Sequence, residues 1–352
     1  MQRFGVSMLV LLMPSLLWAQ AIKQNAVSMH YGAIWAHNPP VAHLAQSHGH
    51  GVAVSHFLRP DTSKAWQQLY NYPKYGYTVL WLNYNSPVLG QSFSGIAFIE
   101  PTIYKSGGFS LTYRIGTGLV YHTRVFDVLQ NPTNIMISSG ISMAMQGGLH
   151  VRQRLTTGWS LTQSIELTHF SNGAFRVPNS GINNFTASVG VSGNMLSKPT
   201  AKPNFEALNQ KRWRTASHAS LGLIERLPSG GKKYAVTHFQ LSGMYRLGQK
   251  SGLMMGAEGI WNRAIRQKII EDELGVPYLR VGVVVGHELF ISKVSLITQM
   301  GIYTFNKTVI DPPLYQRYGL KYNFNKHIYG TLLLKTHYAR AECVEWGLGL
   351  QW

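Results

Sequence analysis

The chain of 352 residues has a single cysteine, few acidic residues and no long apolar segment after its N-terminus. The lone Cys343 excludes an intrachain disulfide, so an exported form would need another means of holding its fold. A transmembrane helix needs roughly 20 apolar residues, but Gly, Arg, His or Glu interrupts each apolar run. A helical membrane protein is therefore excluded. A membrane β-barrel is not, because its alternating strands keep the mean hydropathy near zero, and the value here is -0.06.

The N-terminus has the pattern of an export signal. Arg3 supplies the positive start, an apolar run extends from Leu9 to Trp18, and small residues around Ala21 suit a signal peptidase. The pattern predicts a signal peptide over residues 1–21 and a mature protein that begins directly after it.

The charge is strongly one-sided. The chain has 14 acidic against 32 basic residues, and its formal net charge is +18. Such an excess often indicates nucleic-acid binding, but export argues against a nucleic-acid partner here. A basic surface outside the cell meets the phosphates of lipopolysaccharide or of phospholipid headgroups instead. The alternative is a generic basic surface with no specific partner.

Short alternating runs with frequent glycine and aromatic residues dominate the sequence after the signal. The clearest run is at the C-terminus, where Val344, Trp346, Leu348, Leu350 and Trp352 alternate with Glu345, Gly347, Gly349 and Gln351. Residues 235–246 and 278–288 repeat this period of two, which is typical of strands with one apolar face. A terminal outward-facing aromatic suits the membrane-interface girdle of a barrel. The pattern predicts an all-β, antiparallel transmembrane β-barrel of about 12–16 strands, with about sixteen favoured.

The connections mostly alternate between short and long, as periplasmic turns and extracellular loops do in such barrels. The short ones are at 106–108, 248–250 and 323–325, and the long ones are at 126–133, 263–277 and 305–314. Two long segments, 58–73 and 196–214, fall on the periplasmic side, and the second reads as a basic linker. We therefore expect one barrel over residues 22–352, with a first part at 22–195 and additional strands at 215–352.

One strand carries a candidate catalytic pair. In the run from Ser164 to Ser171, Ile165, Leu167, His169 and Ser171 share one face. The face with Ile and Leu should meet lipid, so His169 and Ser171 should point into the apolar phase. Polar groups there cost on the order of 2–7 kcal/mol if unpaired, which makes them a functional hypothesis by default. A Ser–His pair is also the basic unit of nucleophilic hydrolysis.

A turn-rich loop follows the pair, and a new strand begins near Ile182. Asn183 should therefore lie opposite the end of the strand that carries His169 and Ser171. With both termini periplasmic, odd-numbered strands run outward, and this strand counts as the seventh. The site should then lie at the outer rim of the barrel.

The motifs of this region resemble those of the lipid A 3-O-deacylase family, whose relatives are often labelled acyloxyacyl hydrolases. The resemblance rests on His-Phe-Ser-Asn-Gly at 169–173 and Pro-Asn-Ser-Gly-Ile at 178–182. Similar sequence segments lie at 43–51, 69–73, 86–90 and 114–119. It covers roughly residues 27–195, and the rest matches only in its strand pattern and its end. The resemblance implies an outer-membrane barrel of a Gram-negative bacterium whose membrane-facing Ser and His cleave an acyl ester of lipid A.

One position departs from the best-known deacylases, which carry a Glu where this chain has Asn183. Outer-membrane phospholipase A has a His-x-Ser-Asn-Gly motif and an Asn at this distance, so the triad His169–Ser171–Asn183 looks like that of the phospholipase. An Asn can fix the imidazole tautomer, but it cannot stabilise an imidazolium as a carboxylate does. That phospholipase family uses calcium. No acidic cluster near Ser171 demands a metal, so we expect no metal or other cofactor and leave calcium open.

The expected chemistry is serine ester hydrolysis. His169 removes the proton of Ser171, which attacks the ester carbonyl, and backbone N–H groups near Gly173, with the amide of Asn172 or Asn179, stabilise the oxyanion. Two alternatives stay open: a phospholipase A, and a non-enzymatic, porin-like barrel.

Other polar residues are expected to be structural. Glu166 lies on the opposite strand face from His169 and should point into the lumen. His48, His50 and His238 are expected in loops or the lumen. His48 and His50 lie close together in the sequence, but no obvious third ligand accompanies them, so we do not expect them to bind a metal.

Overall fold

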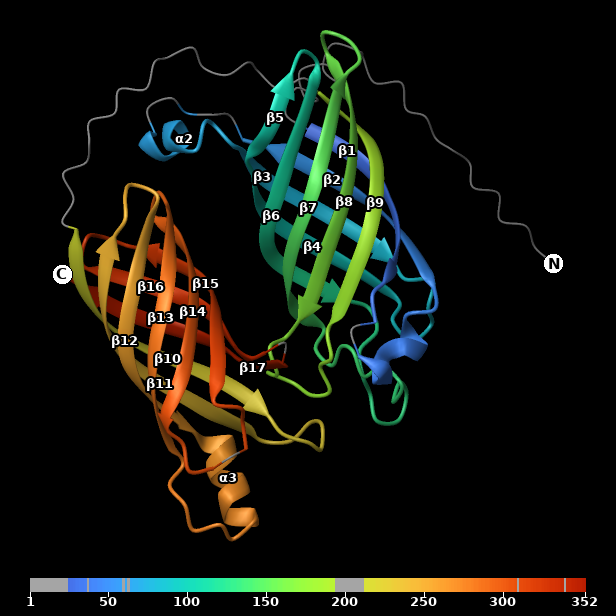
Figure 1. The fold of residues 1–352 in the computed structure, drawn as a ribbon. Helices are drawn as coiled ribbons and strands as arrows, with labels where there is room; N and C mark the ends of the chain where they lie inside the picture. The colour runs from blue at the N-terminus through green and yellow to red at the C-terminus, as the bar shows by residue number, and fades with distance from the viewer. Residues whose placement is uncertain are drawn as a thin grey trace.

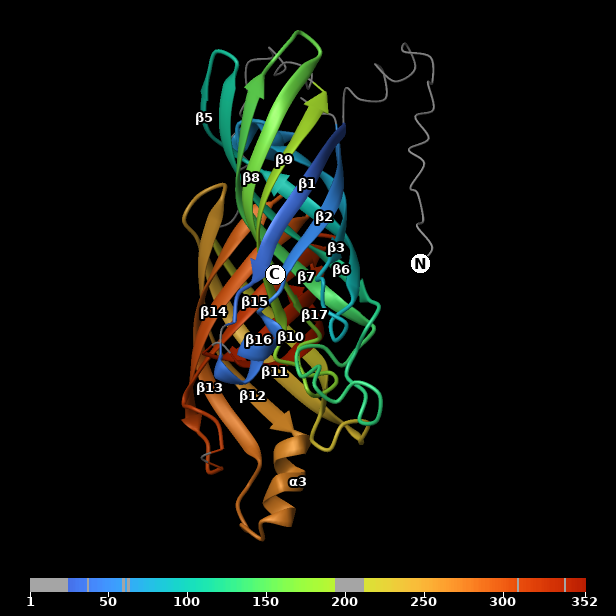
Figure 2. The same cartoon turned by 90° about the vertical axis from the view of Figure 1, so that its right-hand side faces the viewer.

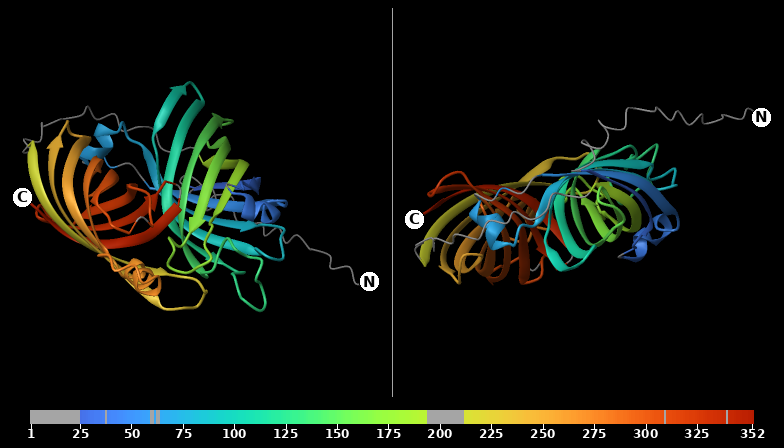
Figure 3. Two further views of the ribbon diagram at one scale, coloured as in Figure 1. Left: turned by 60° about the horizontal axis from the view of Figure 1, so that its bottom comes forward. Right: turned by 90° about the horizontal axis from the view of Figure 1, so that it is seen from above.

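The computed structural model describes residues 25–36, 38–58, 61, 64–193, 212–308, 310–338 and 340–352. The expected signal peptide, and residues 196–211 of the expected linker, lie outside the described residues. The described chain is almost entirely antiparallel β-structure, arranged as two groups of strands (Figure 1). The two groups lie side by side in the views of Figure 3 and overlap along the line of sight in Figure 2.

The first barrel takes its strands from the N-terminal half of the chain. They are β1 (Asn25–Ile34), β2 (His48–Phe57), β3 (Lys74–Asn83), β4 (Gln91–Glu100), β6 (Phe109–His122), β7 (Ile141–Arg154), β8 (Trp159–Ser171) and β9 (Ile182–Gly193). β1 pairs with both β2 and β9, and pairing of β4 with β6 closes the ring. The short β5 (Thr102–Ser106) pairs with β6 alone. A 3-10 helix of six residues, η1 (Pro39–Leu44), and a short α2 (Ala65–Leu69) lie in the connections.

The second barrel is built from the C-terminal part of the chain. Its strands are β10 (Trp213–Glu225), β11 (Lys233–Arg246), β12 (Ser251–Asn262), β13 (Leu279–Ile291), β14 (Val294–Phe305), β15 (Leu314–Asn323), β16 (Ile328–His337) and β17 (Arg340–Gln351). Each strand pairs with the next, and β10 pairs with β17 to close the ring. The helix α3 (Arg263–Glu271) follows β12, and the side chain of Asn262 caps it by accepting from the N–H groups of Ala264 and Ile265. In the described part of the chain, none of the helices is long and apolar enough to span a bilayer.

The all-β, antiparallel barrel class is therefore confirmed, with one difference in how the strands close. The sequence led us to expect one barrel of about sixteen strands, whereas two rings of eight strands share the chain. Alternation along a strand shows which residues face the same side, but it does not show which distant strand completes the ring. Closure here depends on the pairs β1–β9 and β4–β6, which the local pattern does not encode.

Both barrels are polar inside and apolar outside. In the first barrel, buried Glu100 pairs with Arg114 and Arg152. In the second, fully buried Arg317 lies between Glu258 and Glu345, at 2.8 Å from an oxygen of each. Large apolar side chains cover the outer faces, including Met29, Leu119, Met255, Trp346 and Leu348, all more than 60% exposed. This inverted arrangement is that of transmembrane barrels, and rings of eight strands are just wide enough for side chains to fill them.

The two barrels have the same orientation and contact each other at both ends. At the end where β3 begins, the hydroxyl of Tyr70 donates to the carbonyl of Phe290 at 2.9 Å, and the Lys250 ammonium lies 5.2 Å from the Tyr70 ring. At the opposite end, the loop between β8 and β9 contacts β10 and β11. The end with the loop from β8 to β9 also carries the long loops, so it corresponds to the outer side of a bacterial barrel.

Candidate active site

The alternation of β8 directs His169 and Ser171 to the outer face of the first barrel. Thr168 and Phe170, the residues between and beside them, are buried in the interior at 1% and 0% exposure, whereas His169 and Ser171 are half-buried. Ile165, on the same face as the pair, is 52% exposed. β8 is the seventh strand of its ring in chain order, and the pair lies at its outer end, as the sequence predicted.

The neighbouring strand holds the imidazole in one orientation. Asn183 of β9 is the direct cross-strand partner of His169, and its Oδ1 lies 2.6 Å from the imidazole Nδ1. An amide oxygen can only accept, so Nδ1 carries the proton and Nε2 keeps its lone pair. A histidine in this tautomer can accept a proton at Nε2.

Gly181, at the end of the loop, gives the imidazole its space. Its φ is +76°, and a Cβ there would lie 2.8 Å from Cε1 of His169 and 3.5 Å from Nε2. Both the backbone conformation and the close approach require glycine at this position.

Two N–H groups converge on the serine hydroxyl. The Oγ of Ser171 accepts from the Nδ2 of Asn179 at 2.9 Å and from the backbone N–H of Gly173 at 3.2 Å. The Asn179 amide is itself oriented, because its Oδ1 accepts from the backbone N–H of Asn172 at 3.3 Å. Fixed N–H donors beside a serine hydroxyl lie close to where the carbonyl oxygen of an attacked ester would develop negative charge.

The side chain of Asn172 has a different place from those of Gly173 and Asn179. It is buried and donates to the hydroxyl of Ser139 at 3.1 Å and to the carbonyl of Arg176 at 3.0 Å. The sequence left open whether Asn172 or Asn179 supplies the amide beside Ser171, and the geometry gives that place to Asn179. Asn172 instead joins its own loop to the loop at 123–140.

That supporting loop is ordered by its own hydrogen bonds. Backbone N–H groups of Gln130 and Leu129 donate to the Asp127 carboxylate and hold its pKa below the usual value. The carbonyl groups of Ile135 and Met136 then accept from the backbone of Ser180 and Gly181. The sequence marked 126–133 only as a long loop, and no spacing rule could have linked it to the catalytic strand.

Two family models match the chain, and they divide it where the barrels divide it. Residues 50–192 match Lipid A 3-O-deacylase (PagL), and residues 213–352 match Acyloxyacyl hydrolase, C-terminal domain. The chain belongs to the lipid A 3-O-deacylase family. It is thus an ester hydrolase, and the second match extends the family resemblance to the C-terminal strands, which the motifs had left outside. Neither model describes a phospholipase.

Other comparisons add little to the family assignment. No curated protein matches the chain. Among solved structures, a KdgM porin is similar at 7% identity and a TM-score of 0.19, covering 93% of this chain and 98% of that chain. A mutant of the Rh. blastica porin is similar at 6% identity and a TM-score of 0.20, covering 93% and 99%. Scores this low carry no argument about function or arrangement.

In this member of the deacylase family, the second barrel forms hydrogen bonds to the loop that follows Ser171. The buried carboxylate of Glu225, at the end of β10, accepts from the backbone N–H of Val177 at 2.7 Å. The backbone N–H of Glu225 donates to the carbonyl of Ala174 at 3.1 Å. Lys233, which pairs with Glu225 at 3.0 Å, donates to the carbonyl of Phe175 at 2.6 Å. Sequence reasoning missed Glu225 and Lys233, because they lie about fifty residues beyond the loop and carry no motif.

Gly173 itself abuts the second barrel. A Cβ on this residue, whose φ is +62°, would lie 2.5 Å from Cγ2 of Val344 in β17. The backbone that donates to Ser171 therefore lies directly against the outer wall of the other ring.

Among the remaining polar candidates, Glu166 and His238 are lumen residues as expected, whereas His48 and His50 lie exposed on strand β2 and not in a loop or the lumen. Glu166 lies in the first lumen, 2.8 Å from His150, as its strand face predicted. His238 pairs with Glu258 inside the second barrel at 3.0 Å. In the described residues, side chains able to hold a metal gather at Asp311, His337 and Glu342, but Arg280 already pairs with both carboxylates.

Proposed function

We propose that this protein hydrolyses an acyl ester of lipid A in the outer leaflet of a Gram-negative outer membrane, with Ser171 as nucleophile. The observation that carries the proposal is the convergence of the Asn179 amide and the Gly173 N–H on Ser171, beside a histidine oriented by Asn183. The outward position of the pair supports a lipid substrate, because an acyl chain in the bilayer can reach it without leaving the apolar phase.

The first half of the reaction forms an acyl-enzyme. The Nε2 of His169 accepts the hydroxyl proton as Ser171 Oγ attacks the ester carbonyl. The carbonyl oxygen takes up the negative charge, and N–H groups at Gly173 and Asn179 stabilise it. The tetrahedral intermediate then expels the sugar alkoxide, which takes the proton from His169 and leaves as a hydroxyl group.

The second half releases the fatty acid. Water gives a proton to His169 and attacks the acyl-serine, and Ser171 recovers the proton as the carboxylic acid leaves. Asn183 holds Nδ1–H throughout. Its neutral side chain orients the imidazole without placing a carboxylate on the lipid-facing wall, where an unpaired charge would be costly.

The second barrel enters this proposal as a support for the oxyanion donors. Residues 174–178 connect Gly173 to Asn179, and Glu225 and Lys233 hold that stretch at three backbone groups. We assign Glu225 as a positioning residue, since it acts on the donors through the loop and not on the ester.

The test is the mass of lipid A from cells that produce the wild-type protein or Ser171→Ala. Wild-type cells should yield lipid A that lacks one fatty acid, and the variant should lose at least about 10³-fold in rate. Ser164→Ala is the matched control, because Ser164 is on the same strand but faces the lumen.

Two outcomes would overturn the proposal. Unchanged lipid A in cells with folded wild-type protein would remove the substrate. Persisting deacylation by Ser171→Ala would remove the nucleophile. A parallel assay with purified protein and diacyl phospholipid, with and without calcium, separates the deacylase from a phospholipase.

A further inference from the structure

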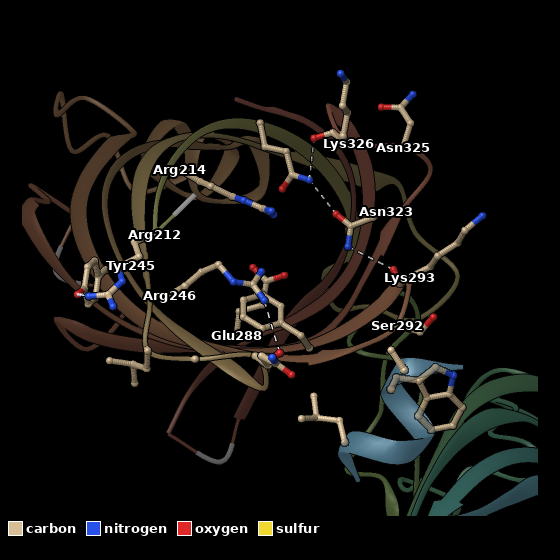
Figure 4. Close-up of a pocket in the computed structure, with 18 of the residues that line it drawn as sticks. Arg212, Arg214, Tyr245, Arg246, Glu288, Ser292, Lys293, Asn323, Asn325 and Lys326 are labelled. Carbon is tan, nitrogen blue, oxygen red and sulfur yellow. Dashed lines mark hydrogen bonds between the residues drawn. The ribbon is translucent and has the colours of Figure 1, made fainter. Parts of the chain in front are cut away.

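The second barrel has a cavity at the end opposite the catalytic loop. Its volume is about 740 Å³, and it opens at the mouth formed by the start of β10, the end of β11 and the turns after β13 and β15. Figure 4 looks into this mouth, with α2 of the first barrel beside it. Sites for small ligands have volumes of about 300–1,000 Å³, so the cavity is large enough for one.

The lining of the cavity is strongly basic. Its cationic side chains are Lys64, Arg212, Arg214, Arg246, Lys293 and Lys326. Among the described lining residues, Glu288 is the single carboxylate, and it pairs with Lys321 at 3.2 Å. The local excess of positive charge is therefore much larger than the average over the chain.

Two arginines are placed inside the mouth. Arg214 and Arg246 come from adjacent strands and extend from the wall into the opening (Figure 4). The guanidinium of Arg246 lies 4.0 Å from the centre of the Phe290 ring, which fixes its plane. The two arginines are also near enough for their charges to repel. Planar, oriented guanidinium groups that face one space are well suited to bind the oxygens of a phosphate.

The floor of the cavity is closed. The side chain of Gln351 accepts from Lys321 at 2.9 Å and donates to Asn323 at 3.0 Å. Deeper in the barrel, the fully buried Arg317 and its carboxylate partners fill the lumen. An anion attracted to the mouth would therefore stop there and not pass through.

We infer that this mouth is a binding site for a phosphate monoester or a polyphosphate, that is, for a phosphate compound with at least two negative charges. It lies at the periplasmic end of the barrel, on the opposite side of the membrane from Ser171, and is separate from the ester-cleaving site. The phosphate can belong to a soluble periplasmic molecule or to the headgroup of an inner-leaflet lipid, and the chemistry of recognition is the same.

The test is calorimetric titration of the full-length protein in a neutral detergent. Inorganic pyrophosphate is the soluble probe. Short-chain phosphatidic acid below its micellar concentration is the lipid probe, because its phosphate monoester carries about 1.5–2 negative charges at neutral pH. The double variant Arg214→Ala/Arg246→Ala should weaken binding at least tenfold. The control Lys105→Ala/Arg154→Ala removes the same charge from exposed positions at the same end of the first barrel and should bind as the wild type does.

The outcomes distinguish a soluble ligand from a lipid headgroup, and binding at the mouth from a general effect of charge. Binding of pyrophosphate but not of the lipid identifies a soluble ligand, and the reverse identifies a headgroup. No saturable binding of either probe to the wild type would overturn the inference. So would an equal loss in both double variants, because the effect would then come from overall charge. Retained deacylation by the Arg214/Arg246 variant would show that its fold is intact.

Discussion

Truncating Glu225 tests whether the second barrel positions the catalytic loop. Its carboxylate is buried at the junction of the barrels and accepts from the backbone N–H of Val177 at 2.7 Å and of Gly230 at 3.1 Å. Lys233 completes its surroundings. Glu225→Ala removes every one of these contacts. Glu225→Gln keeps an acceptor for Val177 but removes the charge and the second acceptor, which Gly230 and Lys233 use.

The size of the effect follows from the bond that holds the loop. A hydrogen bond to a charged group is worth about 1.5–3 kcal/mol, and each 1.4 kcal/mol corresponds to about a tenfold change in rate. If this free energy keeps the oxyanion donors in place, Glu225→Ala should lower kcat by about 10- to 150-fold. KM should change little, because the Glu225 side chain is buried at the junction of the barrels and we assign it to the loop and not to the ester. Glu225→Gln should lose less than about tenfold.

The assay is the initial rate of fatty-acid release from lipid A in mixed micelles, measured over a range of substrate concentrations. Glu271→Ala is the matched control, because Glu271 pairs with Arg226 at the same rim but is 45% exposed and does not touch the loop. Thermal melting of each variant checks that both barrels are folded. A folded Glu225→Ala variant with the kcat of the wild type would refute the positioning role.

Three further predictions follow from the site and the lumen. Gly181→Ala places a Cβ 2.8 Å from the imidazole of His169 and should lower turnover at least tenfold, whereas Gly107→Ala, with open space around it, should not. Asn183→Leu should lower kcat by about 10²–10⁴-fold, because nothing then holds His169 in the tautomer with the proton on Nδ1. Asn183→Asp should move the acidic limb of the pH–rate profile to higher pH, because a carboxylate favours the protonated imidazole of His169. Planar bilayers with the wild type should show no porin-like conductance, since Arg317 and its partners fill the second lumen; steps that persist in purified protein would contradict this.

The faces of the strands were predictable because alternation is a local property. Trp346, Leu348 and Leu350 are exposed on the outside of β17, and Glu345, which directly precedes Trp346, is buried in the lumen. The same reasoning directed His169 and Ser171 outward. Residues that share a strand are related by a fixed geometry, so the sequence alone specifies which of them lie together.

Contacts between distant segments were not predictable in the same way. The pairing of β1 with β9, which closes the first ring, joins residues 150 or more positions apart. Likewise nothing local links Glu225 to Val177, or Gly173 to Val344. These contacts depend on how the completed barrels meet, so a period of two along the chain carries no signal for them.

The separate closure of the two rings determines when the site around Ser171 is complete. Neither barrel lends a strand to the other, so each ring is closed entirely by strands from its own half of the chain. Yet the stretch after Ser171 is fastened to the second ring. A chain whose halves have not met would lack these contacts, so the arrangement of Gly173 and Asn179 around Ser171 would be complete only after both barrels have assembled.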